Sequence, residues 1–328
     1  MTGAFVSESR ESEILGPFAL PTKKLPLYLN VIRYFLLFTL APFRVVCLFT
    51  FVFAALIWAS ICSIGSGFSR TQTLSRWRIT LIKNPVRLVA RLVMYCCGFN
   101  WINKNSFPKL PEGTPYILLS NHLSFVDILT HLYLTFPSFV AKKETLNIPV
   151  VGLISSMMRC VFVDREDLGS RNKTLEAIRE RVENFSNYDY PLLIFPEGTI
   201  ANGTAIPRFK VGAFTPCKPF IIALVHYECP FWNPNWVAKG LLSHIFKLAS
   251  SPHNKLVLRY YTYIPSNEEE ADPNLYMNNV RQFFADELNV PLSSYGYRHH
   301  AVGLKYYSGR ITLDEAEVMI RQLSSLTN

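Results

Sequence analysis

The sequence lacks the motifs that mark several common protein classes. No Cys-x-x-Cys pair or cluster of His and Cys residues is present, so a metal site is not expected. A Gly-x-Ser-x-Gly motif is also absent, which argues against a hydrolase of the Ser-His-Asp type. The net charge is +9, but no recognition-helix pattern or aromatic-basic strand motif accompanies it. A nucleic acid is therefore not an expected partner.

The cysteines give no sign of a disulfide framework. They are odd in number, seven in all, and scattered: Cys47, Cys62, Cys96, Cys97, Cys160, Cys217 and Cys229. This pattern favours a reduced domain that faces the cytosol.

Acidic residues are missing from positions 14–111, which hold twelve Lys and Arg residues. The same region contains the longest uncharged apolar run, positions 45–62, at the lower length limit for a membrane span. A weaker apolar segment precedes it, separated by Pro42 and Arg44. Since proline and charge interrupt apolar helices, residues 28–65 are expected to form a membrane-embedded helical hairpin or a single span.

A basic helix is expected next, within residues 66–110. Lys83, Arg87 and Arg91 recur at helical spacing among leucines and other apolar residues. Such a basic amphipathic helix suits an anionic membrane surface, although a solvated helix face explains any single residue of the three. We therefore expect membrane lipids to be partners of the N-terminal region.

Residues 111–295 alternate between strand and helix patterns. Residues 1–27 are left as an N-terminal tail and residues 296–328 as a C-terminal extension with one amphipathic helix at 313–323. Strands are expected at 115–119, 138–141, 160–163, 191–195, 220–225 and 255–263, and helices at 125–134, 148–158, 170–185 and 273–288. This alternation predicts an α/β fold, a mostly parallel sheet flanked by helices.

His122 and Asp127 follow the first expected strand. Ser124 and Asp127 have the spacing of a helix N-cap and its third residue, a capping-box pattern that places Asp127 in the first helical turn. A neutral imidazole beside a carboxylate can act as a general base on a hydroxyl. Taken alone, both residues are more often structural.

Two further expected strands also end in polar residues. Arg165 follows the strand 160–163, and Glu197, Gly198 and Thr199 follow the strand 191–195. Alone, Arg165 would be a surface ion pair and 196–198 a turn. Functional residues of parallel sheets gather at the carboxyl ends of strands, however, so the shared position favours one site.

Together these motifs resemble the glycerolipid acyltransferase family. The motifs are Asn-His-x-Ser-x-x-Asp at 121–127, Phe-Val-Asp-Arg at 162–165 and Phe-Pro-Glu-Gly-Thr at 195–199. Flanking matches lie at 139–144 and 209–214, and the family's fourth motif falls on 219–222. The resemblance covers roughly residues 85–265, and it implies the glycerolipid acyltransferase fold.

The resemblance also implies roles for the residues. His122, oriented by Asp127, would take the proton of a lysolipid hydroxyl, and the alkoxide would attack the thioester of acyl-CoA. Acyl-CoA is thus an expected co-substrate, with no bound cofactor. The family's acceptor-binding residues, which contact glycerol and phosphate, fall on Arg165, Glu197, Gly198 and Thr199. Two lysines, Lys143 and Lys210, are further candidates to contact phosphates.

The acceptor is expected to be a phosphodiester. Family members that act on lysophosphatidic acid usually carry Arg where this chain has Ile200, and a phosphomonoester needs that extra cation. The runs 197–203 and 272–280 resemble lysophosphatidylcholine and lysophosphatidylethanolamine acyltransferases, which make diacyl phospholipids.

Several alternatives stay open. They are a lysophosphatidic acid acyltransferase, a CoA-independent transacylase and a non-enzymatic membrane scaffold. The resemblance places the protein on the endoplasmic reticulum membrane, with the active site facing the cytosol.

Overall fold

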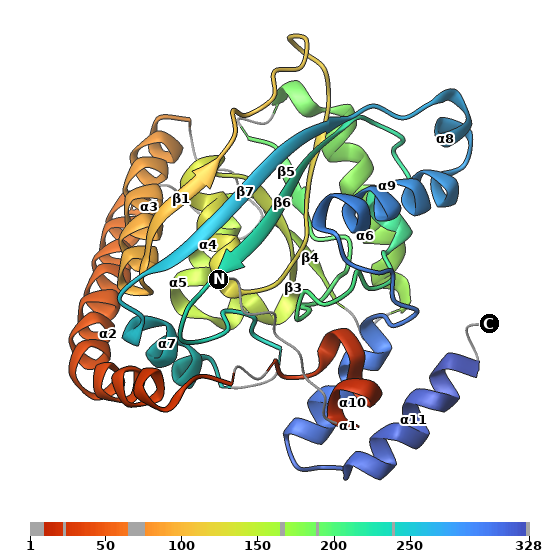
Figure 1. Cartoon of the computed structure of the whole chain (residues 1–328). Helices are drawn as coiled ribbons and strands as arrows, with labels where there is room; N and C mark the ends of the chain where they lie inside the picture. Colours follow the sequence, from red (N-terminus) through yellow and green to blue (C-terminus); the bar gives the residue numbers. More distant parts are fainter. Residues whose placement is uncertain are drawn as a thin grey trace.

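The computed structural model describes residues 10–21, 24–64, 76–164, 168–187, 190–237 and 240–325. A seven-stranded sheet in the order β1-β7-β6-β2-β5-β3-β4 forms its centre (Figure 1). The strands are β1 (Phe99–Lys104), β2 (Ile117–Ser120), β3 (Ser138–Lys142), β4 (Val161–Val163), β5 (Leu192–Ile194), β6 (Phe220–Glu228) and β7 (Asn254–Tyr263). All neighbouring pairs are parallel except β6 and β7. The expected α/β fold with a mostly parallel sheet is confirmed.

Helices cover both faces of this sheet. They are α1 (Arg10–Leu15), α2 (Leu27–Ser63), α3 (Arg76–Cys96), α4 (Phe125–Leu134), α5 (Pro149–Met157), α6 (Leu168–Glu183), α7 (Leu241–Ser250), α8 (Asn267–Ala271), α9 (Pro273–Leu288), α10 (Tyr297–Tyr307) and α11 (Leu313–Ser325), with 3₁₀ turns η1 (Gly16–Phe18), η2 (Lys143–Asn147), η3 (Phe185–Asn187) and η4 (Val211–Ala213). Each strand and helix expected between 115 and 288 has a counterpart, with boundary shifts of a few residues. Strand β1 and helices α1, α7, α8 and α10 were not expected.

The core is divided by the sheet because successive side chains of a strand point to opposite faces. Leu118 of β2 belongs to the core cluster on one face of the sheet, which also includes residues of α2, α3, α4, α5 and α7. Its neighbours Ile117 and Leu119 pack on the other face, with α6 and α9. All three are fully buried, as expected for a parallel strand covered on both sides. The central strands are therefore rigid supports for the loops at their carboxyl ends.

Helix α2 is one continuous helix of 37 residues, with Pro42 inside it. Of the two forms expected for residues 28–65, a hairpin or a single helix, the structure has the single helix. Pro42 removes one backbone hydrogen bond, but tertiary packing offsets that loss. Ala41 and Val45 are buried in the core beside α7, and Arg44 donates to the carbonyl of Ser251 (2.6 Å) at the end of α7. Among the described helices, α2 is the one that is long and apolar enough to cross a membrane.

Helix α3 has the expected amphipathic character, but its basic face does not point outward. Arg87 donates to the Tyr133 carbonyl (2.8 Å), and Arg91 donates to the Phe99 carbonyl (2.8 Å). The half-buried arginines thus satisfy carbonyl groups at the end of α4 and in β1. The exposed stripe carries large apolar side chains instead: Trp77, Leu81, Leu88 and Tyr95. The basic membrane-facing surface expected here is a wrong prediction.

The first described helix, α1, packs with the last two helices, α10 and α11, into one unit that lies below the sheet in Figure 1. We call α1, η1, α10 and α11 the terminal unit; its core contains Leu15, Val302 and Ile320. Arg10 of α1 forms ion pairs with Asp314 (2.5 Å) and with a second carboxylate of α11. The sequence had given these segments as a separate tail and extension.

Candidate active site

His122 lies in the loop between β2 and α4. Ser124 caps α4, and Ser124 and Asp127 form the expected capping box. This box places the Asp127 carboxylate beside the His122 ring, with Nδ1 2.9 Å from Oδ2. Because a carboxylate oxygen accepts, Nδ1 donates, and Nε2 keeps the lone pair that a general base requires. The expected pairing of His122 with Asp127 is thus present in the structure.

Asp127 is fully buried and held by four donors. Besides the His122 ring, the backbone amides of Leu123 (2.6 Å) and Ser124 (2.8 Å) donate to Oδ2. The hydroxyl of Tyr227, on β6, donates to the other oxygen, Oδ1. Burial raises the pKa of Tyr227 well above its ordinary value, so the phenol keeps its proton. The carboxylate is thereby fixed in the orientation that holds His122.

The His122 ring is also fixed by stacking. It lies on the Phe195 ring with centroids 4.0 Å apart and planes 15° apart. Phe195 comes directly after β5, so the stacked pair of rings joins the loops that follow the neighbouring strands β2 and β5. The His122 side chain is 13% exposed, which leaves it accessible to a reactant.

Asn121 anchors the start of this loop to the sheet. Its side-chain amide donates to the Val225 carbonyl (2.9 Å), and its side-chain oxygen accepts from the Val225 amide (2.7 Å). The side chain thus continues the pairing between β2 and β6 beyond the last strand residue. His122 therefore leaves the sheet in a fixed direction.

A second histidine, His131 of α4, cannot serve as the base. It is fully buried, and its Nε2 lies 3.1 Å from the Ser120 hydroxyl. Burial is the main cause that lowers the pKa of His131 to about 4. His131 is inaccessible and weakly basic, whereas His122 is accessible.

Glu197 supports the His122 loop from the loop after β5. Its Oε1 accepts from the His122 backbone amide (3.1 Å), and its Oε2 is buried with no hydrogen-bond partner among the described residues. Burial, helped by the charge of Asp127 and opposed by the His122 amide, raises the pKa of Glu197 to about 8. The side chain is only 1% exposed. Glu197 is thus positioned to hold the loop, while its expected contact with the acceptor stays a prediction.

The Glu197→Gln variant should lose a pH dependence of stability. The folded carboxyl titrates near pH 8 and the unfolded one near its ordinary value of 4.5, so the folded state binds more protons between these values. Stability of the wild type therefore falls as pH rises through this window. At pH 8.5 the variant should be more stable by on the order of 5 kcal/mol, because the folded and unfolded pKa values differ by about 3.5 and each pKa unit is worth about 1.4 kcal/mol.

Thermal unfolding at pH 5 and pH 8.5 tests this. The variant should exceed the wild type in stability by much more at pH 8.5 than at pH 5. An equal difference in stability at both pH values would contradict the raised pKa of Glu197.

Gly198 and Lys210 lie against each other. Gly198 has φ +67°, a left-handed conformation, and a Cβ there would lie 2.6 Å from the Lys210 side chain. Lys210 also donates its backbone amide to the Pro196 carbonyl (2.8 Å), and its Nζ lies 4.9 Å from the Tyr297 ring centroid. The left-handed φ favours glycine at 198, whereas the end of the flexible Lys210 side chain could move aside for a Cβ.

The remaining expected site residues are placed as follows. The Thr199 hydroxyl lies 2.8 Å from Nδ1 of His300, on α10. Lys143 is exposed and pairs with Asp164 (3.1 Å). Arg165 lies outside the described residues. No described residues form a group of three or more His, Cys, Asp and Glu side chains that could hold a metal.

The sequence analysis did not assign a role to three residues that fix His122: Asn121, Phe195 and Tyr227. Asn121 and Phe195 are adjacent to motif residues, so their positions were a usable signal. Tyr227 is 100 residues from Asp127 along the chain, and only the pairing of β2 with β6 brings the two together.

Comparisons with known proteins agree with this architecture. Residues 101–224 match the family model named Acyltransferase. Lysophosphatidylcholine acyltransferase 1 of Danio rerio is 33% identical over 265 residues, covering 79% of this chain and 50% of that protein. Lysophospholipid acyltransferase LPEAT1 of Arabidopsis thaliana is 36% identical over 248 residues, 67% of this chain and 62% of that protein. The chain therefore spans about half to three fifths of these relatives.

A solved structure shares the fold. The crystal structure of the 1-acyl-sn-glycerophosphate acyltransferase PlsC from Thermotoga maritima aligns with a TM-score of 0.51 at 16% identity. The alignment covers 77% of this chain and 100% of that one.

Proposed function

We propose that this chain, whose residues 101–224 match the Acyltransferase family model, is a membrane-bound, acyl-CoA-dependent lysophospholipid O-acyltransferase. The observation that carries this proposal is the accessible His122, held by buried Asp127 with Nε2 as its basic nitrogen. The product would be a diacyl phospholipid. The relatives named above support a lysophosphatidylcholine or lysophosphatidylethanolamine acceptor.

In this mechanism His122 removes a proton from the acceptor's hydroxyl as that oxygen attacks the thioester carbonyl. The C–S bond then breaks, and the proton passes from His122 to the departing thiolate of coenzyme A. Asp127 stabilises the imidazolium that forms between these two steps. The acyl chain moves directly to the acceptor, so the protein needs no nucleophile of its own. Arg165 and Lys143 are proposed to bind phosphate near this site.

A panel of acceptors tests the proposed substrate class. Oleoyl-CoA would be supplied with lysophosphatidylcholine, lysophosphatidylethanolamine, lysophosphatidic acid or glycerol-3-phosphate. Because Ile200 supplies no cation beside the acceptor motif, the two phosphodiesters should be preferred. Preference for lysophosphatidic acid would retain the mechanism and reject the headgroup assignment. Formation of product without acyl-CoA would instead identify a transacylase.

For its membrane contact, we propose that the protein rests on the bilayer through an apolar surface formed by α2 and α3. One face of α2 packs against α3, α5 and α7, while its other face exposes residues such as Phe38 and Phe53. Trp58 of α2 donates its indole N–H to the Leu81 carbonyl of α3 (3.0 Å), so the apolar stripes adjoin. A continuous apolar face of this kind suits helices that lie in the plane of the membrane surface with that face in the lipid.

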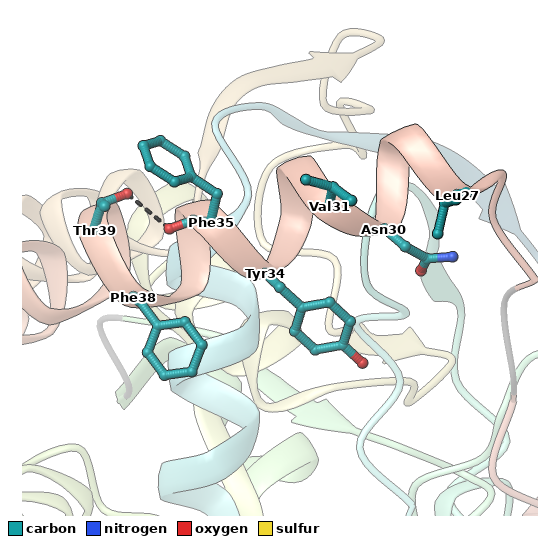
Figure 2. A pocket seen from close by; sticks show the side chains of 7 residues that line it. All are labelled: Leu27, Asn30, Val31, Tyr34, Phe35, Phe38 and Thr39. Carbon is teal, nitrogen blue, oxygen red and sulfur yellow. Dashed lines mark hydrogen bonds between the residues drawn. The ribbon is translucent and has the colours of Figure 1, made fainter.

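The same surface contains a shallow, open apolar hollow along the start of α2 (Figure 2). Its lining residues are Leu27, Asn30, Val31, Tyr34, Phe35, Phe38 and Thr39. All of them belong to one helix, and none belongs to the candidate active site. We assign this hollow to contact with lipid chains.

This membrane assignment predicts hydrophobic rather than electrostatic binding. The purified protein should bind neutral phosphatidylcholine vesicles about equally at ~0.1 M and ~0.5 M salt, because only exposed charges are screened. The triple variant Phe38→Ser/Phe53→Ser/Trp77→Ser should partition at least about tenfold more weakly, since each such side chain is worth ~1.5–3 kcal/mol. Asn84→Ala, on the same exposed face of α3, is the matched control. Release by salt alone would contradict the assignment.

A further inference from the structure

Two backbone carbonyl groups in the loop that carries His122 are held by neighbouring segments. The Ala201 amide, in the segment that follows β5, donates to the His122 carbonyl (2.9 Å). The Trp236 amide, in the segment between β6 and α7, donates to the Leu123 carbonyl (3.0 Å). These two bonds act on the backbone of the loop, whereas the contacts described above fix the imidazole ring. The place of His122 therefore depends on both neighbouring segments.

Asn202 joins these two segments to each other. Its backbone carbonyl accepts from the side-chain amide of Asn235. Asn202 directly follows Ala201, and Asn235 directly precedes Trp236, so each donor to the His122 loop stands next to one of the two linked asparagines. A shift of Asn202 would consequently be passed to both donors.

Asn202 also holds the N-terminal part of the chain. Its backbone amide donates to the Pro17 carbonyl (2.8 Å), and its side-chain amide donates to the carbonyl groups of Gly16 (3.0 Å) and Ala19 (3.1 Å). Its side-chain oxygen accepts from the Thr204 amide (3.0 Å) and hydroxyl (2.7 Å). Two N–H donors and one acceptor on a short side chain are what asparagine offers. The residue is 7% exposed, so these bonds form away from solvent.

The segment that Asn202 holds belongs to the terminal unit or adjoins it. Gly16 and Pro17 are in η1, and Ala19 comes directly after that turn. A continuous set of hydrogen bonds therefore runs from the terminal unit through Asn202 and Ala201 to the His122 carbonyl. Carbonyl groups left buried without a donor are unfavourable, so loss of the two side-chain N–H groups would favour displacement of the segment from the loop.

We propose that Asn202 is a positioning residue, through which the terminal unit fixes the backbone of His122 for acyl transfer. This inference rests on the proposed function. Asn202 acts through Ala201 and needs no contact with either substrate. Its loss should therefore lower kcat and leave the KM values unchanged.

Three substitutions separate this role from packing. Asn202→Asp keeps the oxygen that Thr204 uses but has no amide N–H groups for Gly16 and Ala19. Thr204→Ala is the matched control, because it removes a hydrogen bond to the same side chain and leaves the N-terminal segment bound. Asn235→Ala breaks the link between the two segments and leaves the Asn202 side chain intact, so it tests the same coupling if Asn202→Asp does not fold.

The experiment measures kcat, together with KM for oleoyl-CoA and lysophosphatidylethanolamine, for the full-length proteins at a temperature where each is folded. Asn202→Asp should lower kcat by at least about tenfold, because a displacement of about 1 Å can cost a hundredfold in rate. Both KM values should stay within about twofold of the wild type. Thr204→Ala should match the wild type, and Asn235→Ala should lower kcat by a smaller factor.

Hydrogen exchange gives a second measurement that does not depend on the reaction. In Asn202→Asp the Ala201 amide, which donates to His122, should exchange faster than in the wild type and in Thr204→Ala. Exchange at the wild-type rate would overturn the inference, because Asn202 would then not hold this donor in place.

The kinetic outcomes are equally decisive. Equal kcat values for Asn202→Asp and Thr204→Ala would overturn the inference while leaving the proposed function intact. A raised KM at unchanged kcat would also overturn it, because Asn202 would then act in substrate binding. Absence of transfer by the wild type would overturn the proposed function, and the exchange of the Ala201 amide would then decide whether Asn202 positions the His122 loop.

Discussion

Replacing His122 with alanine is expected to lower kcat for acyl transfer by about 10²–10⁴-fold, the usual contribution of a general base. The fold should survive, because Asp127 keeps the Leu123, Ser124 and Tyr227 donors when the imidazole is removed. KM values for both substrates should change little. The measurement is steady-state transfer from oleoyl-CoA, with thermal unfolding of the same preparations.

His253→Ala is the matched control for this variant. His253 is exposed in the segment between α7 and β7, so its loss should leave both rate and stability unchanged. A His122→Ala protein with more than about a tenth of the wild-type kcat would rule out His122 as the base, since even a weak general base contributes about a hundredfold.

Replacing Asp127 with alanine should reduce both activity and stability. Three donors would remain buried without an acceptor: the Leu123 amide, the Ser124 amide and the Tyr227 hydroxyl. Each such group costs about 1–3 kcal/mol, so a loss of at least ~3 kcal/mol is expected. His122 would also lose the partner that fixes its tautomer, so kcat should fall by at least about a hundredfold.

Tyr227→Phe gives a graded comparison for Asp127→Ala. It removes one of the four donors and keeps the ring in place, so the loss in stability should be on the order of 1 kcal/mol. Chemical denaturation of the three proteins measures the order of stability. Stability of Asp127→Ala equal to that of the wild type would contradict the view that Asp127 organises the loop.

The parts of the site that are close together in sequence were predictable. The capping box joins Ser124 to Asp127 within one helical turn, and it places His122 beside the carboxylate. The alternation of strand and helix predicted a parallel sheet, and the polar residues after its strands indicated where a site would form. These signals depend on short-range spacing, which a single sequence displays directly.

Contacts between distant segments were not predictable in this way. Thr199 meets His300 across 101 positions, and the terminal unit joins residues from the two ends of the chain. Such pairs leave no periodic pattern in the sequence. The strand β1 was missed for a related reason, because its exposed Trp101 and polar neighbours give it little apolar alternation.

In the N-terminal region, the hairpin alternative for residues 28–65 and the basic surface of α3 failed for one physical reason. Pro42 and the basic residues of α3 were interpreted by their local preference, for a helix break and for an anionic surface. In the folded protein, tertiary contacts override both local preferences. Packing beside α7 keeps α2 helical through Pro42, and backbone carbonyl groups take the Arg87 and Arg91 side chains away from the surface.

The most direct test of the central claim is to measure released CoA thiol and diacyl phospholipid in the same reaction. The purified protein would receive labelled oleoyl-CoA and lysophosphatidylethanolamine. Direct transfer through His122 predicts equal amounts of thiol and product, and neither when the lysolipid is omitted. Thiol release without lysolipid, or product without thiol release, would contradict the proposed acyltransferase reaction.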